Sequence, residues 1–326
     1  MHHEFRYLSR GQVESLGMSM EEVIEVVEEV FRLKGEGRCE MPPKPGIHPE
    51  SPDSFLHAMP GYVPDLCGAG IKWVSGFPVN RERGLPYICA TLILNDPETG
   101  LPLAIMDGTW ITAVRTGAAT AVAARYLARP DSRVMGMLGC GVQGRSNLAA
   151  LRVVLKEMDR VKAYDIDPEA LRRYVEEMSG RHGIRVDPVE SPKEAVEGAD
   201  VIVTAGPILK NPEPVIQDDW IAPGAFGCAL DYDSYWRADA FRGADRLFSD
   251  DVTQTEYARA HKGFFSSLPK SIIDFGDVVA GKVPGRQSPT ERLLSLHQGL
   301  ALEDMATAVR ILRLAESKGV GTMLPL

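Results

Sequence analysis

The sequence lacks the patterns that mark disulfide-stapled, metal-binding and membrane proteins. Its five cysteines contain no C-x-x-C pair, and their odd number fits a reducing cytoplasm better than a disulfide framework. The seven histidines show neither H-x-x-x-H nor H-E-x-x-H spacing, so we predict no metal centre. No uncharged apolar run approaches the roughly 18 residues of a membrane span, and the mixed polarity that follows Met1 does not indicate a signal peptide.

Positive charge is also in short supply. Lysine and arginine number 36 against 45 acidic residues, which gives a net charge of −9. Nucleic acids and acidic membranes attract basic surfaces, so neither is expected as a partner. The apolar fraction of 44% and the charged fraction of 25% are those of an ordinary globular protein. A chain of 326 residues is long enough for about two domains.

The most informative stretch is a glycine turn that follows an apolar run. The run Val134–Leu138 leads into three glycines spaced G-x-G-x-x-G, and a helix is predicted over 145–156. This order is typical of dinucleotide binding, because the glycines allow a tight turn, a close approach to pyrophosphate and close packing of helix on strand. The pyrophosphate is expected on the N–H groups at the start of the helix. The predicted cofactor-binding residues of the turn are Gly139, Gly141, Val142, Gln143 and Gly144.

A carboxylate stands where this fingerprint places its ribose-binding acid. A second strand is predicted over 161–165 and ends in Asp165. A carboxylate there accepts both ribose hydroxyls and repels a 2′-phosphate, and no cation follows until Arg172, so we predict NAD rather than NADP. Two alternatives are weaker. A phosphate-binding loop needs lysine where Arg145 stands, and the other alternative is a glycine turn without a ligand.

The rest of this half alternates strands and helices as βα units do. Helices are predicted over 167–179 and from Ser191, and strands over 184–186, 200–206 and 225–230. The pattern predicts a Rossmann-type, doubly wound parallel sheet, in which ligands bind at the carboxyl ends of the strands. Two carboxylates, Asp231 and Asp233, follow the last of these strands. They are candidates for proton transfer, and the alternative role for either is to cap the next helix.

The first part of the chain has a different pattern. Ser19-Met20-Glu21-Glu22 is a capping box, and the helix that it starts is predicted to end at Gly35. Strands predicted over 67–75, 87–95 and 101–106 indicate a predominantly antiparallel sheet. The proline-rich segment Met41–Pro64 is predicted to form extended segments and loops. It holds Lys44, His48 and His57, each histidine being either a surface residue or a substrate contact.

Two cations are conspicuous in this part. Lys72 interrupts an apolar strand, and lysine is rarely buried unless it is paired. The alternative is an edge-strand lysine that discourages aggregation. Arg115 lies near the start of an alanine-rich helix that runs to Ala128, where a cation is unfavourable unless it binds an anion such as a carboxylate. The alternative is a salt bridge to Asp107 or another acid. A long amphipathic helix from Leu302 stops at Gly319.

Several motifs together resemble the ornithine cyclodeaminase/μ-crystallin family, which also includes archaeal alanine dehydrogenase and several imine-forming or imine-reducing enzymes. The matching segments are 70–74 (GIKWV), 84–86 (GLP), 107–108 (DG), 112–116 (TAVRT), 139–144 (GCGVQG) and 301–308 (ALEDMATA). The resemblance implies an NAD-binding Rossmann domain over 129–298. This domain is inserted in an α+β substrate-binding and dimerisation domain formed by residues 1–128 and 299–326. It also implies a homodimer.

The resemblance also implies roles for single residues. Lys72 resembles the family's active-site lysine, and Arg115 resembles its substrate-carboxylate arginine. Lys44 falls where many members have a second carboxylate-binding arginine, so the bidentate grip of that arginine is lost here. We add His57 as a further substrate contact.

The remaining implied roles concern the cofactor and the proton. The family's catalytic aspartate falls on Asp233, with Asp231 two residues earlier as the alternative. The glycines that precede this aspartate in cyclodeaminases are missing here, which argues against ornithine cyclisation itself. We assign Thr112 and Thr204 to the cofactor site.

These assignments predict an NAD-dependent oxidoreductase that acts on the C–N bond of a small amino or imino acid. Arg115 and Lys72 are expected to hold the carboxylate, and Asp233 or Asp231 to move the proton. The first alternative is cyclodeamination, in which the hydride is removed and later returned while ammonia leaves. The second is a non-catalytic ligand-binding protein like μ-crystallin. That branch of the family is associated with NADPH, and Asp165 disfavours NADPH.

Overall fold

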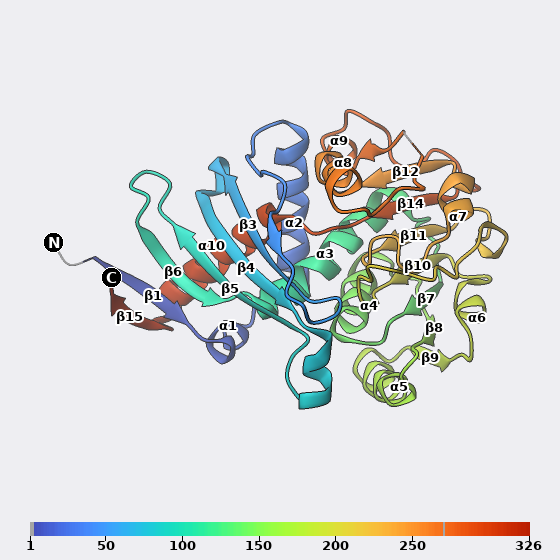
Figure 1. Ribbon diagram of the computed structural model, residues 1–326, viewed down its shortest axis with the longest axis horizontal. Helices are drawn as coiled ribbons and strands as arrows, with labels where there is room; N and C mark the ends of the chain where they lie inside the picture. The colour runs from blue at the N-terminus through green and yellow to red at the C-terminus, as the bar shows by residue number, and fades with distance from the viewer. Residues whose placement is uncertain (1–2, 270) are drawn as a thin grey trace. The chain divides into compact units, whose positions relative to one another are not determined.

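The computed structural model describes residues 3–269 and 271–326. The contacts divide the chain into two compact units, Met1–Arg115 with Leu300–Leu326, and Thr116–Gly299. Each unit is built on its own sheet (Figure 1). Within the described residues, no helix is long and apolar enough to cross a membrane.

The sheet of the first unit has seven strands in the order β15-β1-β6-β5-β4-β3-β2. All neighbours pair antiparallel except β1 and β6, so the predicted, predominantly antiparallel sheet is confirmed. The strands are β1 (Glu4–Leu8), β2 (Gly46–Ile47), β3 (Phe55–Val63), β4 (Gly68–Gly76), β5 (Ile88–Asn95), β6 (Pro102–Asp107) and β15 (Thr322–Pro325).

One face of this sheet is covered by the last helix, α10 (Ala301–Lys318), which packs on β3, β4 and β5 (Figure 1). Helix α2 (Met20–Gly35) packs on α10 in turn, and its predicted capping box at Ser19 is formed. A small residue is required under α10, because a Cβ on Gly61 would lie 3.1 Å from the backbone of Ala301. The remaining helical segments of the unit are α1 (Arg10–Ser15), η1 (Pro64–Leu66) and η2 (Pro78–Arg83).

Strand alternation gives the sheet two different faces. The face under α10 carries one buried row across five strands, and Lys72 is the second residue of that row. The opposite face carries a second apolar row that is only partly buried. In strand order the buried row is Met59, Lys72, Leu92, Met106 and Leu8, and the outer row is Pro60, Ile71, Ile93, Ile105 and Tyr7.

Strand β3 lies within the proline-rich segment for which we predicted only extended segments and loops. Its nine residues pair along their whole length with β4, whereas the short β2 covers only Leu56 and His57 on its other side. On the same side the Ala58 N–H donates to the carbonyl of Pro45, and Glu40 pairs with Tyr62. Pro60 lies between these contacts, where its missing N–H is not needed.

The second unit contains an all-parallel sheet of eight strands in the order β13-β12-β14-β11-β10-β7-β8-β9. The predicted fold class, a Rossmann-type sheet inserted in an α+β domain, is confirmed. The strands are β7 (Val134–Leu138), β8 (Arg160–Tyr164), β9 (Arg185–Pro188), β10 (Val201–Thr204), β11 (Phe226–Ala229), β12 (Arg246–Ser249), β13 (Ile273–Asp274) and β14 (Leu293–Leu296).

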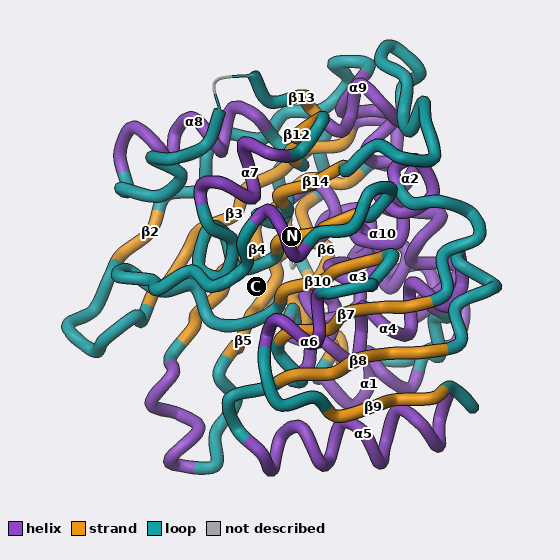
Figure 2. Tube along the Cα trace, turned by 90° about the vertical axis from the view of Figure 1, so that its right-hand side faces the viewer, coloured by secondary structure: helices purple, strands orange, loops and turns teal. Residues whose placement is uncertain are grey.

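The strand order reverses at β7, which pairs with β8 on one side and with β10 on the other (Figure 2). Ligands of open α/β sheets bind outside the carboxyl ends of the strands at such a switch point. Helices connect the strands, and α5 packs on β9. The helices are α3 (Thr109–Leu127, which spans the division between the units), α4 (Val142–Val154), α5 (Pro168–His182), α6 (Pro192–Val196), η3 (Asp218–Trp220), α7 (Ala238–Gly243), α8 (Val252–His261) and α9 (Phe275–Val279).

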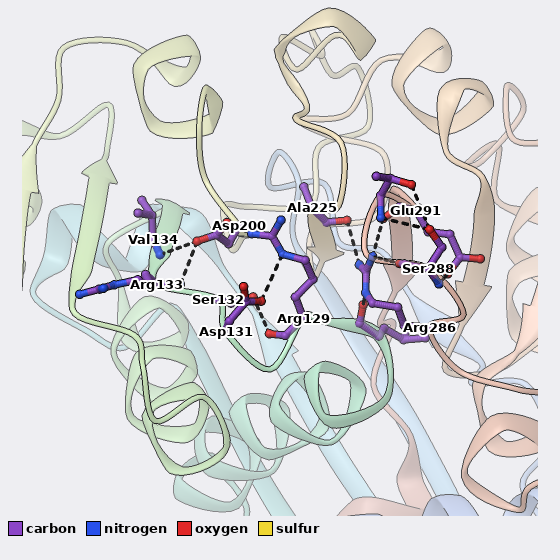
Figure 3. Close-up of polar contacts among 12 residues, drawn as sticks. Arg129, Asp131, Ser132, Arg133, Val134, Asp200, Ala225, Arg286, Ser288 and Glu291 are labelled. Atoms are coloured by element: carbon purple, nitrogen blue, oxygen red, sulfur yellow. Dashed lines mark hydrogen bonds and ion pairs between the residues drawn. The ribbon is translucent and has the colours of Figure 1, made fainter.

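The amino-terminal ends of these strands are held by structural polar contacts (Figure 3). Asp200, just before β10, accepts hydrogen bonds from Arg129 and from the backbone N–H groups of Arg133 and Val134 at the start of β7. Arg286 donates to backbone carbonyls, among them that of Ala225 before β11. These contacts satisfy backbone groups that the sheet leaves unpaired, so we assign this edge to stability.

Candidate active site

The glycine turn follows β7 at the switch point and has the geometry of a phosphate-binding turn. Gly139 has a φ of +99°, a region that side chains other than glycine rarely adopt. A Cβ on Gly144 would lie 2.5 Å from the carbonyl oxygen of Gly139, so this glycine lets α4 pack on the turn. A Cβ on Gly141 would meet nothing within 4 Å. The open space is therefore at the position where the fingerprint brings the backbone close to pyrophosphate.

Helix α4 begins at Val142, three residues before the predicted start, and its first turn has no side-chain cap because Gly141 is the N-cap. Val142 is exposed, and Gln143 and Gly144 complete the first turn. An uncapped helix N-terminus favours an anion, since it presents N–H groups at the positive end of the helix dipole. The predicted residues of the turn thus come together in the arrangement that a dinucleotide pyrophosphate requires.

Arg145 supports the turn from inside and does not act like the lysine of a phosphate loop. Its guanidinium donates to the carbonyl oxygens of Cys140 and Gly141, and to Glu177 at 2.7 Å. It also lies over the ring of Tyr174. These contacts fix the backbone of the turn, which favours the dinucleotide interpretation over the phosphate-loop alternative.

Asp165 directly follows β8, beside the end of β7, as the fingerprint predicts. One carboxylate oxygen accepts the N–H of Cys140 at 2.7 Å and the other accepts the N–H of Asp167 at 2.9 Å. Each oxygen has a second lone pair, so the carboxylate can hold the turn and still accept ribose hydroxyls. Ile166 beside it is 74% exposed and offers an apolar surface at the same edge.

The ends of β10 and β11 are joined by a buried hydrogen-bond network. The Thr204 hydroxyl donates to Asp231 at 2.8 Å and accepts from the indole of Trp236 at 2.9 Å. The second oxygen of Asp231 accepts the N–H of Gly206 at 3.0 Å. Burial raises the pKa of Asp231 to about 7, although both hydrogen bonds act in the opposite direction. Thr204 and Asp231 are therefore fully buried parts of the framework.

Asp233 differs from Asp231 because the chain turns between them. Tyr232 has a φ of +60°, a left-handed conformation that is strained for a tyrosine and that separates the two carboxylates. Asp233 Oδ2 accepts the N–H of Phe265 at 2.8 Å, whereas Oδ1 has no hydrogen-bond partner among the described residues. Burial raises the pKa of this carboxyl. Asp233 also lines a cavity of about 400 Å³ together with Trp236 and Arg237.

In the first unit, a cluster of buried charges lies between the sheet and α10. Lys72 on β4 places its ammonium nitrogen 2.6 Å from Asp304 Oδ2, in an ion pair whose angle is poor for a hydrogen bond. Arg115 donates through Nε to Asp304 Oδ1 at 3.1 Å and through Nη1 to Glu303 Oε2 at 2.9 Å. Each of these side chains is at most 6% exposed. Lys72 is thus a buried, paired lysine and not an edge-strand residue.

A third cation, Lys44, acts on this cluster. Lys44 is also buried, and its charge acts on Lys72 together with that of Arg115. Lys72 and Arg115 pair with the carboxylates of Glu303 and Asp304, and Lys44 acts on Lys72 through its charge. Burial and the two neighbouring cations lower the pKa of Lys72 to about 7, while Asp304 opposes this shift. Burial also raises the pKa of Glu303. Buried cations held in this way can bind a carboxylate.

The other predicted residues, Arg115, Thr112 and His57, lie on α3 and β3. Arg115 lies in the second turn of α3, and its acid partners are Glu303 and Asp304, whereas Asp107 caps the helix by accepting the N–H groups of residues 109 and 110. Thr112 donates to the carbonyl oxygen of Gly108 in the same helix. His57, on β3, stacks on the ring of Phe55 at 4.6 Å and meets His48 edge-on at 5.9 Å.

Sequence reasoning missed two groups of polar residues. Glu303 and Asp304 received no role, although two carboxylates in the first turn of an apolar helix are a signal for buried pairing. The second group lies after β12 and β14, where the buried Asp250 accepts the N–H of Gly299 at 2.7 Å and the buried Gln298 donates to Thr255 at 2.7 Å. Its only signal was the run of polar residues that ends each strand.

Comparison with known proteins gives matches over nearly the whole chain. The profile of the ornithine cyclodeaminase/mu-crystallin family matches residues 5–319. Alanine dehydrogenase from Archaeoglobus fulgidus is 38% identical over 328 residues, which cover 97% of each chain. The structure of Thermococcus litoralis Δ1-pyrroline-2-carboxylate reductase in complex with NADH and L-proline is 35% identical with a TM-score of 0.87, covering 98% of this chain and 99% of its own. An archaeal alanine dehydrogenase dimer with bound NAD is also 35% identical with a TM-score of 0.87, covering 99% of each chain.

Proposed function

Because the chain belongs to the ornithine cyclodeaminase/mu-crystallin family, as its motifs predicted, we propose that it is an NAD-dependent oxidoreductase acting on the C–N bond of a small amino or imino acid. Relatives with more than a third of their residues in common are an alanine dehydrogenase and a pyrroline-2-carboxylate reductase. The observation that carries the proposal is the buried cluster in which Asp304 and Glu303 hold Lys72 and Arg115, with the charge of the buried Lys44 acting on Lys72.

We assign the substrate carboxylate to this cluster. Arg115 is oriented by two carboxylates, and Lys72 stands beside it on the same acid. A group of fixed cations shielded from water binds a carboxylate more strongly than exposed lysines do, because the local dielectric is low. Lys44 adds a third cation, and His57 is retained as a proposed contact for the remainder of the substrate.

The cofactor that fits the second unit is NAD. Relatives of known structure hold NADH or NAD, and the glycine turn here leaves open space at Gly141 and an uncapped helix start for a pyrophosphate. When bound, NAD supplies the acceptor for the α-hydride of the amino acid. Asp165 favours NAD over NADP because a 2′-phosphate would meet a carboxylate of like charge. Comparable KM values for the two cofactors would contradict this preference. We retain Thr112 and Thr204 as proposed parts of this site, Thr204 through its support of Asp231.

We assign the proton transfer to Asp233 rather than to Asp231. Asp233 has a carboxylate oxygen without a partner and lines a cavity, and burial raises its pKa toward the range of a useful general base. Both oxygens of Asp231 are engaged by Thr204 and Gly206. Asp233 would accept a proton from the amine or from the attacking water as the imino acid forms.

The direct test is a screen of amino acids with NAD, and of cyclic imines with NADH, followed at the NADH absorbance. An amino acid dehydrogenase accumulates NADH, and an imine reductase consumes it. Release of ammonia from ornithine or a similar diamino acid without accumulated NADH would instead establish cyclodeamination. Binding of NAD(P)H without turnover of any substrate would favour the ligand-binding alternative.

We further propose a homodimer that forms through the outer face of the seven-stranded sheet. A relative is a dimer, and the apolar row of Pro60, Ile71, Ile93, Ile105 and Tyr7 lies on that face. Residues 1–128 with 299–326 would carry dimerisation and substrate binding, and residues 129–298 the cofactor. Five free cysteines, of which Cys67 and Cys89 are exposed, support a cytoplasmic location.

A further inference from the structure

A single carboxylate pairs with two cations of the proposed substrate site, Lys72 and Arg115. Asp304 uses Oδ1 for the Nε atom of Arg115, at 3.1 Å, and Oδ2 for the ammonium of Lys72, at 2.6 Å. The three residues come from three different elements, α10, α3 and β4. Asp304 is fully buried, so solvent does not screen either pair.

The two cations would repel one another without this carboxylate. Lys72 is fully buried, and the charges of Arg115 and Lys44 both disfavour its ammonium form, whereas Asp304 favours it. Glu303, the other acid of the cluster, binds Arg115 through Nη1 and also acts on Lys72 through its charge, without an ion pair to it. Asp304 therefore pairs with both cations, and it is the acid whose charge favours the ammonium form of Lys72.

We propose that Asp304 is a positioning residue, which fixes the spacing between Lys72 and Arg115 and keeps Lys72 charged for binding the substrate carboxylate. The inference rests on the proposed function only for the identity of the bound group. The competing explanation is that the ion pairs merely fasten α10 to the sheet, in which case their loss would lower stability without changing how Lys72 titrates or how substrate binds.

The first test is Asp304→Asn, which removes the negative charge of the side chain and keeps its shape. The titration of Lys72 is followed by NMR of ¹⁵Nζ-labelled lysine in the NAD-bound protein, and Lys72→Met identifies its signal. With Arg115 and Lys44 left as neighbours, the midpoint is expected to fall by about one to three pH units. Glu303→Gln is the matched control, because it removes a neighbouring acid that binds Arg115 alone, and it should shift the midpoint by less than half as much. An unchanged midpoint in Asp304→Asn, or equal shifts in the two variants, would overturn the proposal.

The second test is Asp304→Glu, which keeps the carboxylate but displaces it by one methylene group. The longer side chain retains an acid for Lys72 but displaces the oxygens that set the spacing to Arg115. We expect a Lys72 midpoint within about half a pH unit of the wild type. We also expect kcat/KM for the carboxylate substrate to be lowered at least about tenfold. Wild-type kinetics in this variant would refute the positioning role, and the variant answers the question even where Asp304→Asn does not fold.

The outcomes separate this inference from the proposed reaction. If no amino or imino acid is turned over and the Lys72 midpoint still falls in Asp304→Asn, the positioning role holds and the proposed reaction is wrong. If turnover is found and the midpoint does not move, the proposed reaction holds and Asp304 is only structural.

Discussion

Asp231 and Asp233 stand two residues apart, yet the structure gives them different surroundings. The sequence predicted that one of them moves the proton and left the choice open. What separates them is the left-handed conformation of Tyr232 and the partners that Thr204, Gly206 and Phe265 provide. None of these partners follows from the local sequence, because they come from other strands and loops.

We expect Asp233→Asn to lower kcat by at least about a hundredfold, since general acid–base help contributes about 10²–10⁴-fold. The unfolding temperature should change little, because Asp233 Oδ2 accepts the N–H of Phe265 and an asparagine oxygen can accept the same bond. Steady-state kinetics with the best substrate of the screen provides the measurement. Activity of Asp233→Asn within a few-fold of the wild type would contradict the assignment of proton transfer to Asp233.

Asp231 should make the free energy of unfolding depend on pH. Its folded pKa of about 7 lies above its ordinary value of 3.8, so the folded carboxyl keeps a proton that the unfolded chain has lost between these limits. The free energy of unfolding therefore falls as pH rises through this window, by up to about 4 kcal/mol. Asp231→Asn should reduce that slope between pH 4 and 7, although it loses one hydrogen bond at every pH. The part of the slope that remains comes from Asp233 and Glu303, whose pKa values burial also raises. Urea unfolding at several pH values measures the slope, and Lys72 does not disturb it because its own titration begins near pH 7.

The sequence indicated that Arg115 and Lys72 are buried charges, but it did not indicate the acid that they share. An arginine near a helix start and a lysine in an apolar strand were each unusual enough to mark a buried charge, and both are buried. Their acid Asp304 lies 189 positions beyond Arg115. No spacing rule links residues so distant, and only the packing of α10 on the sheet brings them together.

At the scale of elements, the sequence predicted best where a local signal ends a helix or strand. The capping box at Ser19 and the C-terminal Gly319 place α2 and α10 within a residue of their observed bounds. Helix α4 begins three residues earlier than predicted because its N-cap is a glycine without a capping side chain. Strands β1, β12, β14 and β15 were not predicted, since each is short and is stabilised by partners distant in the chain.

The glycine turn offers a test in which folding and cofactor binding are separated. A Cβ on Gly141 meets no atom of the chain within 4 Å, and the φ of Gly141 is −81°, which alanine tolerates. Gly141→Ala should therefore keep the wild-type unfolding temperature and weaken NAD binding at least about tenfold, because the methyl group occupies the space of the pyrophosphate. Fluorescence titration with NADH measures the affinity.

Two other glycines serve as comparisons for this experiment. Gly180→Ala in α5 also meets nothing within 4 Å. It should leave the affinity unchanged and stabilise the fold by about 0.5–1 kcal/mol, because alanine favours a helix over glycine. Gly144→Ala would place a methyl group 2.5 Å from the oxygen of Gly139 and should destabilise the fold itself. Unchanged NADH affinity in Gly141→Ala would contradict the proposed location of the pyrophosphate.

At the scale of the whole molecule, the outer face of the seven-stranded sheet has apolar side chains that a single chain leaves partly exposed. An ordinary antiparallel sheet pairs a buried apolar face with a polar one. Here the outer row is apolar, and so is the buried row apart from Lys72. Trp73, two residues from Ile71 on the same face of β4, is 42% exposed, and Leu103 on β6 is 37% exposed. Contiguous exposed apolar surface of this kind marks an interaction site.

If two copies of the chain cover this face, a charge placed in its middle should separate them. Trp73→Glu is expected to convert a dimer into a monomer, as measured by size-exclusion chromatography with light scattering, because a buried unpaired carboxylate opposes association. The side chain is partly exposed in the single chain, so circular dichroism should show that the variant keeps its secondary structure. Val215→Glu, at a partly exposed apolar residue of the other unit, should leave the mass unchanged. A Trp73→Glu variant with the mass of a dimer would place the interface elsewhere on the molecule.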